Sequence, residues 1–357
     1  MKIALVHDYL IEAGGAERVL IELSRLYPEA PIYVALTKQG SAKSSLSGKK
    51  IIESKWAPIL KIGRLYSYLR FLLPFVWKSI DLRDYDLVIT SCSGYIARGF
   101  NVSPKTRVVA YCHTPPRWLY GYDTPTGADK KWWGQVFMWA IGPFLRYFDY
   151  QSAQRVDVWV ANSKEVAKRI EKFYRKKSTV IYPPISLGLE RSNQNIRNDY
   201  YLMISRIVGG KGIEVASEAF KKLGLELKIV GEVIDLELGS RVGSLGRVSD
   251  SELASLYTNA RGFVAMARDE DFGMTVVESM SYGTPVLAYN GGGYKETVIP
   301  GETGILINKL DLESIKSGVE EMESIKWDKS KIIKWSNRFS VEEFDKKIRE
   351  VVNARTS

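Results

Sequence analysis

The order of hydrophobic and polar positions along this chain predicts short buried strands that alternate with helices. Val19, Leu20 and Leu23 have helical spacing after the first apolar run, and helical stretches separate several of the later runs. Because strands joined by helices pair in parallel, we expect an α/β protein. The apolar runs of strand length are residues 2–6, 86–91, 107–111, 157–162, 179–182, 200–205, 225–230 and 262–267.

A break near the middle of the chain divides these elements into two groups. Pro183 and Pro184 end the regular pattern, and residues 190–199 form a polar stretch that is typical of a linker. The chain has 357 residues, which is enough for two domains that each bury a core. We therefore place the domain boundary between residues 185 and 186.

The most informative stretch comes after the apolar run that ends at residue 267. Phe272 and Gly273 turn the chain there, and a helix opens at Thr275, so its N-terminal N–H groups and dipole favour an anion. Glu270 precedes this turn and Glu278 lies inside the helix, eight positions later. Carboxylates repel phosphate, so we expect both to accept hydrogen bonds from hydroxyl groups on either side of it. A nucleotide-sugar has that layout.

A second charged motif lies directly after the strand at residues 200–205. Arg206 and Lys211 lie five positions apart on a glycine-rich loop that opens a helix at Ile213. Arginine offers a planar fork to phosphate oxygens and lysine a point charge, so the pair is a candidate diphosphate clamp. The alternative is two solvated loop cations.

These motifs resemble family 4 of the retaining glycosyltransferases with the two-domain GT-B fold. The resemblance is carried by Glu-Asp-Phe-Gly from Glu270, by Glu-Ser-Met from Glu278 and by the Gly-Thr-Pro-Val that begins at Gly283. It implies two Rossmann-like domains that face a central cleft. Residues 1–185 would be the acceptor-side domain and residues 186–340 the nucleotide-sugar-binding domain. A helix within residues 341–357 would cross back to the first domain.

The resemblance also implies roles for single residues. Arg206 and Lys211 would bind the donor diphosphate and offset its charge, Glu270 would contact the sugar, and Glu278 would hold ribose hydroxyls. His113, just beyond a strand of the first domain, would reach the donor sugar. A structural hydrogen bond is the alternative for this histidine. The other residues assigned to donor binding are Gly14, Gly15, Phe272, Gly273, Met274, Thr275, Val248 and Asp250.

Two of these donor-binding assignments have simple structural alternatives. Gly14 and Gly15, at a strand-to-helix turn, would lie against the donor diphosphate or would only form a tight turn. Asp250 would accept hydrogen bonds from the N–H groups of a guanine ring, or Asp250 or Ser249 would simply cap a helix.

The function that this resemblance implies is transfer of a hexose to a hydroxyl of a glycan or lipid-linked glycan. The transfer would retain the configuration at the anomeric carbon and would need no metal or other cofactor. Tyr-Cys-His-Thr-Pro, from Tyr111, resembles the mannosyltransferase branch, so mannose from GDP-mannose is the expected donor. A UDP-sugar donor, with glucose or an N-acetylhexosamine, is the alternative. Further alternatives are a nucleotide-sugar epimerase and a non-catalytic subunit that binds nucleotide-sugar or lipid.

A metal-dependent glycosyltransferase of the other fold is a further alternative. Such enzymes bind the metal through Asp-x-Asp, a pattern that Asp84 and Asp86 fit, as do Asp269 and Asp271. The pattern is short enough to arise by chance.

Charge and aromatic residues concentrate in the first half. Residues 1–185 contain 28 Lys and Arg against 15 Asp and Glu, a surplus of 13, whereas residues 186–357 contain 23 against 26. Residues 61–78 and 130–150 combine basic and aromatic side chains, so we expect helices there that either contact a membrane or pack on their own domain. We find no nucleic-acid-binding signature. Two widely spaced cysteines and an N-terminus without a signal-peptide pattern favour the cytoplasm, at the membrane face.

Overall fold

The chain folds into two compact units, each built on a parallel sheet. The computed structural model describes residues 1–11, 14–38, 44–62, 66, 68–122, 132–185, 199–204, 211–231 and 241–354. Unit 1 contains Met1–Tyr122, Ala128–Pro184 and Phe344–Ser357, and unit 2 contains Ile185–Glu343. Of the predicted linker at residues 190–199, only Asp199 lies within the described residues.

Unit 1 has a seven-stranded sheet in which every described pairing is parallel. Its order is β3-β2-β1-β4-β5-β6-β7, so the winding reverses between β1 and β4. The central strands are almost completely buried because helices cover both faces. The strands are β1 (Ile3–His7), β2 (Ile32–Val34), β3 (Ile51–Glu53), β4 (Leu87–Cys92), β5 (Arg107–Cys112), β6 (Val158–Ala161) and β7 (Thr179–Val180).

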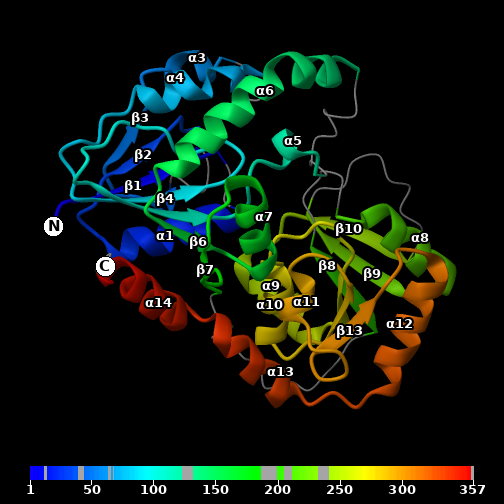
Figure 1. The fold of residues 1–357 in the computed structure, drawn as a ribbon. Helices are drawn as coiled ribbons and strands as arrows, with labels where there is room; N and C mark the ends of the chain where they lie inside the picture. The colour runs from blue at the N-terminus through cyan, green and yellow to red at the C-terminus, as the bar shows by residue number, and fades with distance from the viewer. Residues whose placement is uncertain are drawn as a thin grey trace. The chain divides into compact units, whose positions relative to one another are not determined.

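Helices cover the two faces of this sheet in separate apolar layers. In Figure 1, α1 (Gly15–Leu26) and α14 (Val341–Asn353) lie below the sheet, and α3, α4 and α6 lie above it. The aromatic stretch at residues 130–150 lies mainly in one helix, which continues to Gln154. The helices that share this layer with α6 are α3 (Ala57–Leu60), η2 (Leu69–Leu72), α4 (Leu73–Lys78), α5 (Arg117–Tyr120), α6 (Trp132–Gln154) and α7 (Lys164–Tyr174).

The last helix, α14, completes the core of unit 1. Phe344, Ile348 and Val352 recur at helical spacing and are each no more than 5% exposed, packed against α1 and the sheet. The guanidinium of Arg107, at the start of β5, donates to the carbonyls of Val351 and Val352 at 3.0 and 2.6 Å. These bonds satisfy carbonyl groups that the end of a helix otherwise leaves without partners.

Unit 2 repeats the same plan with six strands. The order β10-β9-β8-β11-β12-β13 is again parallel throughout, and the winding reverses between β8 and β11. The sequence patterns did not predict β10, β12 or β13. The strands are β8 (Tyr200–Ile204), β9 (Glu226–Val230), β10 (Val242–Gly246), β11 (Gly262–Ala265), β12 (Val286–Tyr289) and β13 (Gly304–Ile307).

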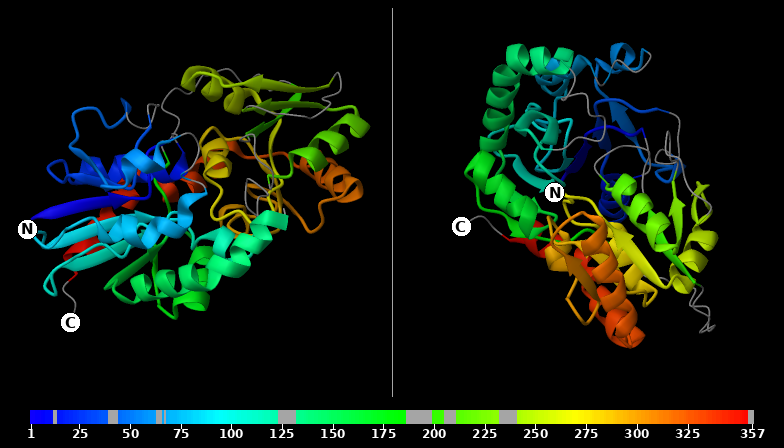
Figure 2. Two further views of the ribbon diagram at one scale, coloured as in Figure 1. Left: turned by 90° about the horizontal axis from the view of Figure 1, so that it is seen from above. Right: turned by 90° about the vertical axis from the view of Figure 1, so that its right-hand side faces the viewer.

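The helices of unit 2 also form two layers. On one face, α8 and α12 lie side by side, as Figures 1 and 2 show. The opposite face is covered by α9, α10, α11 and α13. The helices are α8 (Ile213–Leu223), α9 (Asp250–Asn259), α10 (Met274–Ser281), α11 (Tyr294–Thr297), α12 (Leu312–Ser324), α13 (Lys329–Ser336) and η4 (Asn337–Phe339). The structure therefore confirms two Rossmann-like α/β units.

Candidate functional site

The sheet of unit 2 brings the two charged motifs of the sequence together. Lys211 lies beyond the carboxyl end of β8, and Glu270 lies beyond the carboxyl end of β11. These strands are neighbours at the point where the winding reverses. Open α/β sheets bind ligands in the crevice at such a point.

Lys211 and Glu270 form an ion pair. The ammonium group of Lys211 donates to Oε2 of Glu270, and the side chains are 43% and 16% exposed. The buried Tyr294 of α11 donates from its hydroxyl to the same oxygen at 3.4 Å. A phosphate or hydroxyl ligand that entered here would meet a cation and a carboxylate side by side.

Glycines allow the loop that carries Glu270 and the loop before α11 to pack closely together. A Cβ atom on Gly292 or Gly293 would collide with the backbone of residues 270–272, and the N–H of Gly293 donates to the carbonyl of Glu270 at 2.8 Å. Gly273 has a φ of +89° and lies against the ring of Tyr294, where a Cβ atom would approach Cε1 to 2.7 Å. Only glycine fits these positions without movement of the neighbouring chain.

Helix α10 starts at this loop and carries the second glutamate. Gly273 is its N-cap, so Met274 and Thr275 occupy the first turn, where amide N–H groups lack intrahelical partners. Phe272 is buried and packs edge-to-face on Phe339 at 5.5 Å.

Glu278 of α10 is only 8% exposed and is held by a neighbouring aromatic side chain. It accepts a hydrogen bond of 2.9 Å from the hydroxyl of Tyr257 on α9. Tyr257 in turn stacks on Tyr282, with ring centroids 5.4 Å apart. This buried, oriented carboxylate differs from the solvated surface glutamate that an ordinary amphipathic helix would carry.

The proposed base-binding residues lie just beyond the edge strand β10. Val248 packs against the α9–α10 layer of the core, and Asp250 is the first residue of α9. Ser249 is the N-cap of α9 and forms a capping box with Glu252, as one of the two sequence interpretations expected. Because β9 separates β10 from β8, these residues do not share the loop pair that holds Lys211 and Glu270. Arg206 lies outside the described residues.

In unit 1, the two glycines begin helix α1. Gly14 is the N-cap, Gly15 is the first helical residue, and Oε2 of Glu17 accepts from the N–H of Gly14 at 2.9 Å. This capping box fixes the first turn of α1.

His113 lies one residue beyond the carboxyl end of β5 and is 9% exposed. Its Nε2 is 2.8 Å from Oγ of Ser91, and that oxygen is 3.0 Å from Nδ1 of His7. Burial lowers the pKa of His113 to about 3, with neighbouring His7 adding to this effect and Glu17 opposing it. The imidazole of His113 is therefore neutral near pH 7. The sequence motifs assigned no role to His7 or Ser91.

Another acidic residue at this edge accepts hydrogen bonds from three backbone N–H groups and from the hydroxyl of Ser93, the latter at 2.7 Å. Asp8 is 3% exposed and accepts hydrogen bonds of 2.9 and 3.0 Å from the N–H groups of Ser93 and Tyr95. Its other oxygen accepts from the N–H of Ala97 at 2.9 Å. Asp8 thus fixes the loop at the carboxyl end of β4.

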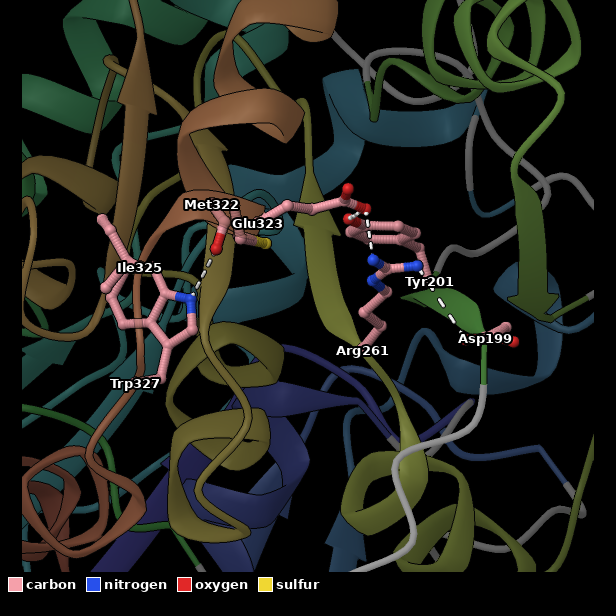
Figure 3. Close-up of a pocket in the computed structure, with 7 residues that line it drawn as sticks. All are labelled: Asp199, Tyr201, Arg261, Met322, Glu323, Ile325 and Trp327. Atoms are coloured by element: carbon pink, nitrogen blue, oxygen red, sulfur yellow. Dashed lines mark hydrogen bonds and ion pairs between the residues drawn. The ribbon is translucent and has the colours of Figure 1, made fainter.

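A pocket of about 290 Å³ lies elsewhere in unit 2, at the amino ends of β8 and β11. Figure 3 shows Arg261 directed toward Glu323, 3.0 Å away, while the hydroxyl of Tyr201 donates to the same carboxylate at 2.9 Å. Trp327 donates to the carbonyl of Met322 at 2.8 Å on the far side. None of the sequence-predicted site residues lines this pocket.

Within the residues that the structure describes, no group of three or more His, Cys, Asp or Glu side chains is arranged to hold a metal ion. Asp86 accepts from the N–H of Lys2 at 2.6 Å. None of the helices among the described residues is long and apolar enough to cross a lipid bilayer.

Comparison with known proteins gives matches along most of the chain. A model described as Glycosyltransferase Family 4 matches residues 13–189, and one described as Glycosyl transferases group 1 matches residues 189–338. A crystal structure of HepE from Anabaena in complex with UDP and glucose matches with a TM-score of 0.71 and 18% identity, and the match covers 99% of this chain and 100% of that one. This match shows the GT-B type of fold.

Two curated relatives are similar in sequence. The alpha-1,3/1,6-mannosyltransferase ALG2 of Candida glabrata is 24% identical, over 84% of this chain and 78% of that protein. An uncharacterized glycosyltransferase of Methanocaldococcus jannaschii is 28% identical over 189 residues, which are 50% of this chain and 52% of that protein. The match thus spans about half the length of the archaeal relative.

Replacement of Gly273 tests how tightly the Glu270 loop is built. We expect Gly273→Ala to destabilise unit 2 by about 2–4 kcal/mol, because it adds a collision with Tyr294 to the strain of a positive φ. Gly224→Ala is the matched control, because Gly224 has a φ of +68° but open space around it, so only about 1–2 kcal/mol should be lost. Urea unfolding measures both, and equal losses would contradict this packing.

The lowered pKa of His113 predicts a pH-dependent stability. An unfolded histidine titrates near pH 6.5, so below that pH the unfolded chain binds a proton that the native state excludes. The stabilising effect is complete above about pH 6.5 and is lost as the pH falls toward 3. Between pH 7 and about pH 4.5, the free energy of unfolding of the wild type should fall by about 2–3 kcal/mol more than that of His113→Asn. Parallel pH profiles in urea unfolding would exclude this prediction.

Proposed function

The chain belongs to glycosyltransferase family 4, and from this premise we propose that it transfers mannose from GDP-mannose to a hydroxyl group. Transfer would retain the configuration at the anomeric carbon and would need no metal or other cofactor. The acceptor would be a glycan or a lipid-linked glycan.

The choice of mannose is supported by one relative and one motif. ALG2 of Candida glabrata, which is similar over most of both chains, is named as a mannosyltransferase. The Tyr-Cys-His-Thr-Pro sequence that begins at Tyr111 resembles the same branch of the family. Asp250 would accept hydrogen bonds from the guanine ring of GDP.

The single observation that carries the proposal is the contact between Lys211 and Glu270. In a nucleotide-sugar the sugar carbon is bonded directly to a phosphate oxygen, so groups that bind the sugar and the diphosphate must be neighbours. A cation and a carboxylate in contact at the winding reversal of the sheet meet this requirement. Lys211 would take the diphosphate, and Glu270 would accept hydrogen bonds from sugar hydroxyls.

The chemistry of transfer is consistent with these contacts. The bond between the anomeric carbon and the phosphate oxygen breaks, and the acceptor oxygen bonds to the same face of that carbon. The leaving phosphate takes the proton of the acceptor hydroxyl, so no protein nucleophile is needed. Arg206, Lys211 and the first turn of α10 would stabilise the negative charge that develops on the diphosphate.

Two further residues would orient the donor. Glu278, held by Tyr257, would accept from the ribose hydroxyls. His113, which is neutral near pH 7, would hydrogen-bond a hydroxyl of the sugar. The Gly14–Gly15 turn would lie against the diphosphate.

We also propose that helix α6 docks on the cytoplasmic face of an anionic membrane. Its exposed side chains recur along one side of the helix, with Trp132 and Trp139 at 77% and 82% exposure, and Val136 and Tyr147 at 56% and 65%. Aromatic residues of this kind favour the membrane interface, and the positive charge of the first half attracts anionic lipids.

Donor binding and transfer provide the direct test of the enzymatic proposal. Calorimetry should show GDP-mannose binding at least about tenfold more tightly than UDP-glucose or UDP-N-acetylglucosamine, and hydrolysis should persist in EDTA. Lys211→Met should lower kcat/KM about 100-fold, because one charge-stabilising group is lost.

Lys222→Met is the matched control, because Lys222 lies on α8 and pairs with Glu218 on the surface of the same helix. Full activity of Lys211→Met would contradict the proposed site. Tighter binding of a UDP-sugar would replace the donor assignment, and binding without turnover would indicate a non-catalytic subunit.

Vesicle co-sedimentation tests membrane docking. The protein should bind vesicles that contain anionic phospholipid, and Trp132→Ala with Trp139→Ala should weaken binding at least about tenfold, because two interfacial aromatic anchors are lost. Leu245→Ala, which removes an exposed apolar side chain in unit 2, should have no effect. Equal binding of the double variant and the wild type would contradict docking through α6.

A further inference from the structure

A line of buried polar side chains crosses three neighbouring strands in unit 1. His7 is the last residue of β1, Ser91 lies opposite it on β4, and His113 lies directly after β5. Oγ of Ser91 lies 3.0 Å from Nδ1 of His7 and 2.8 Å from Nε2 of His113. On the other side of His7, Nε2 lies 3.9 Å from Oε1 of Glu17. All four residues are at least nine-tenths buried.

The serine hydroxyl couples the protonation of the two rings. A hydroxyl group has one proton, so in the simplest arrangement Ser91 donates to one imidazole nitrogen and accepts an N–H from the other. If it donates to His7, then His113 carries its proton on Nε2. If it donates to His113, then His113 carries its proton on Nδ1. The direction in which the Ser91 hydroxyl donates therefore fixes the tautomer of both histidines.

Glu17 decides between the two directions. Its Oε2 accepts the N–H of Gly14 at 2.9 Å, a bond that favours the ionised carboxylate. Its other oxygen faces Nε2 of His7, so an N–H at that nitrogen is electrostatically favoured over a lone pair. His7 is then an acceptor at Nδ1. Ser91 donates to it and accepts from Nε2–H of His113.

We propose that Glu17, His7 and Ser91 are positioning residues that hold His113 as the Nε2–H tautomer, with the lone pair of Nδ1 available to accept a hydroxyl proton from the donor sugar. The step from tautomer to sugar contact rests on the proposed function. Burial keeps the ring neutral, so the lone pair is preserved across the physiological pH range. The carboxylate of Glu17 also caps α1, so the same side chain holds Gly14 and sets the tautomer of His113.

An acceptor nitrogen on His113 requires a hydrogen-bond donor at the matching position of the substrate. A hydroxyl satisfies an acceptor nitrogen because it donates a proton, whereas a fluorine at the same position cannot. Replacement of the relevant donor hydroxyl by fluorine should therefore lower kcat/KM about tenfold or more, the loss expected for one hydrogen bond. If His113 donated instead, fluorine would be partly tolerated.

Nitrogen-15 NMR of the imidazole rings tests the proposal without substrate. The chain contains only two histidines, so His7→Asn assigns both sets of signals. We expect His113 in the Nε2–H form in the wild type. Glu17→Gln should shift His113 toward the Nδ1–H form. The glutamine oxygen can still accept from Gly14, while its NH₂ group donates to Nε2 of His7. His7 then carries its proton on Nδ1 and donates to Ser91, so Ser91 donates to Nε2 of His113. Ser91→Ala should remove the coupling, so that Glu17→Gln no longer affects His113.

Two control variants separate positioning from general structural damage. Glu22→Gln lies on the same helix α1, and Ser24→Ala removes a hydroxyl that donates to the carbonyl of Ile21 within that helix, so both should leave the tautomer unchanged. A wild-type His113 in the Nδ1–H form would overturn the proposal, as would a Glu17→Gln variant with unchanged imidazole signals. The tautomer is read without donor, so a failure of transfer activity would contradict the proposed function separately.

Discussion

Parallel strand pairing is the constraint on which the rest of this structure depends. It places the carboxyl ends of all strands in a unit at one edge, so residues far apart in the sequence meet there. In unit 2 this constraint joins Lys211 to Glu270, and in unit 1 it aligns His7, Ser91 and His113. The chemistry of each unit is therefore set by the residues at the carboxyl ends of its strands, while the rest of each strand supplies only the core.

The two edges are supported in different ways. Around Glu270, glycines bring backbone into contact and Tyr294 orients the carboxylate, so the support is mainly steric. Around His113, the support is a chain of buried hydrogen bonds that ends at Glu17. Such buried networks specify orientation and protonation, because an unmatched donor or acceptor there is costly.

The sequence predicted the two-unit α/β fold, because its strands are short apolar runs bounded by glycine, proline and polar residues. It also singled out Glu270, Glu278 and Lys211 as site candidates through a motif resemblance. It did not predict that Lys211 contacts Glu270, since the local pattern gives no strand order. Ser91 went unnoticed because a single serine in an apolar run has no signal of its own. The position of His7, Ser91 and His113 at strand ends was the available clue, and it becomes informative only once β1, β4 and β5 are known to be neighbours.

A crystal structure of the protein with GDP-mannose would test the central claim most directly. The account predicts that a diphosphate oxygen lies within hydrogen-bonding distance of Nζ of Lys211, with sugar hydroxyls on Glu270 and on Nδ1 of His113. A donor whose diphosphate lay away from Lys211, for example in the pocket beside Arg261 and Tyr201, would contradict it.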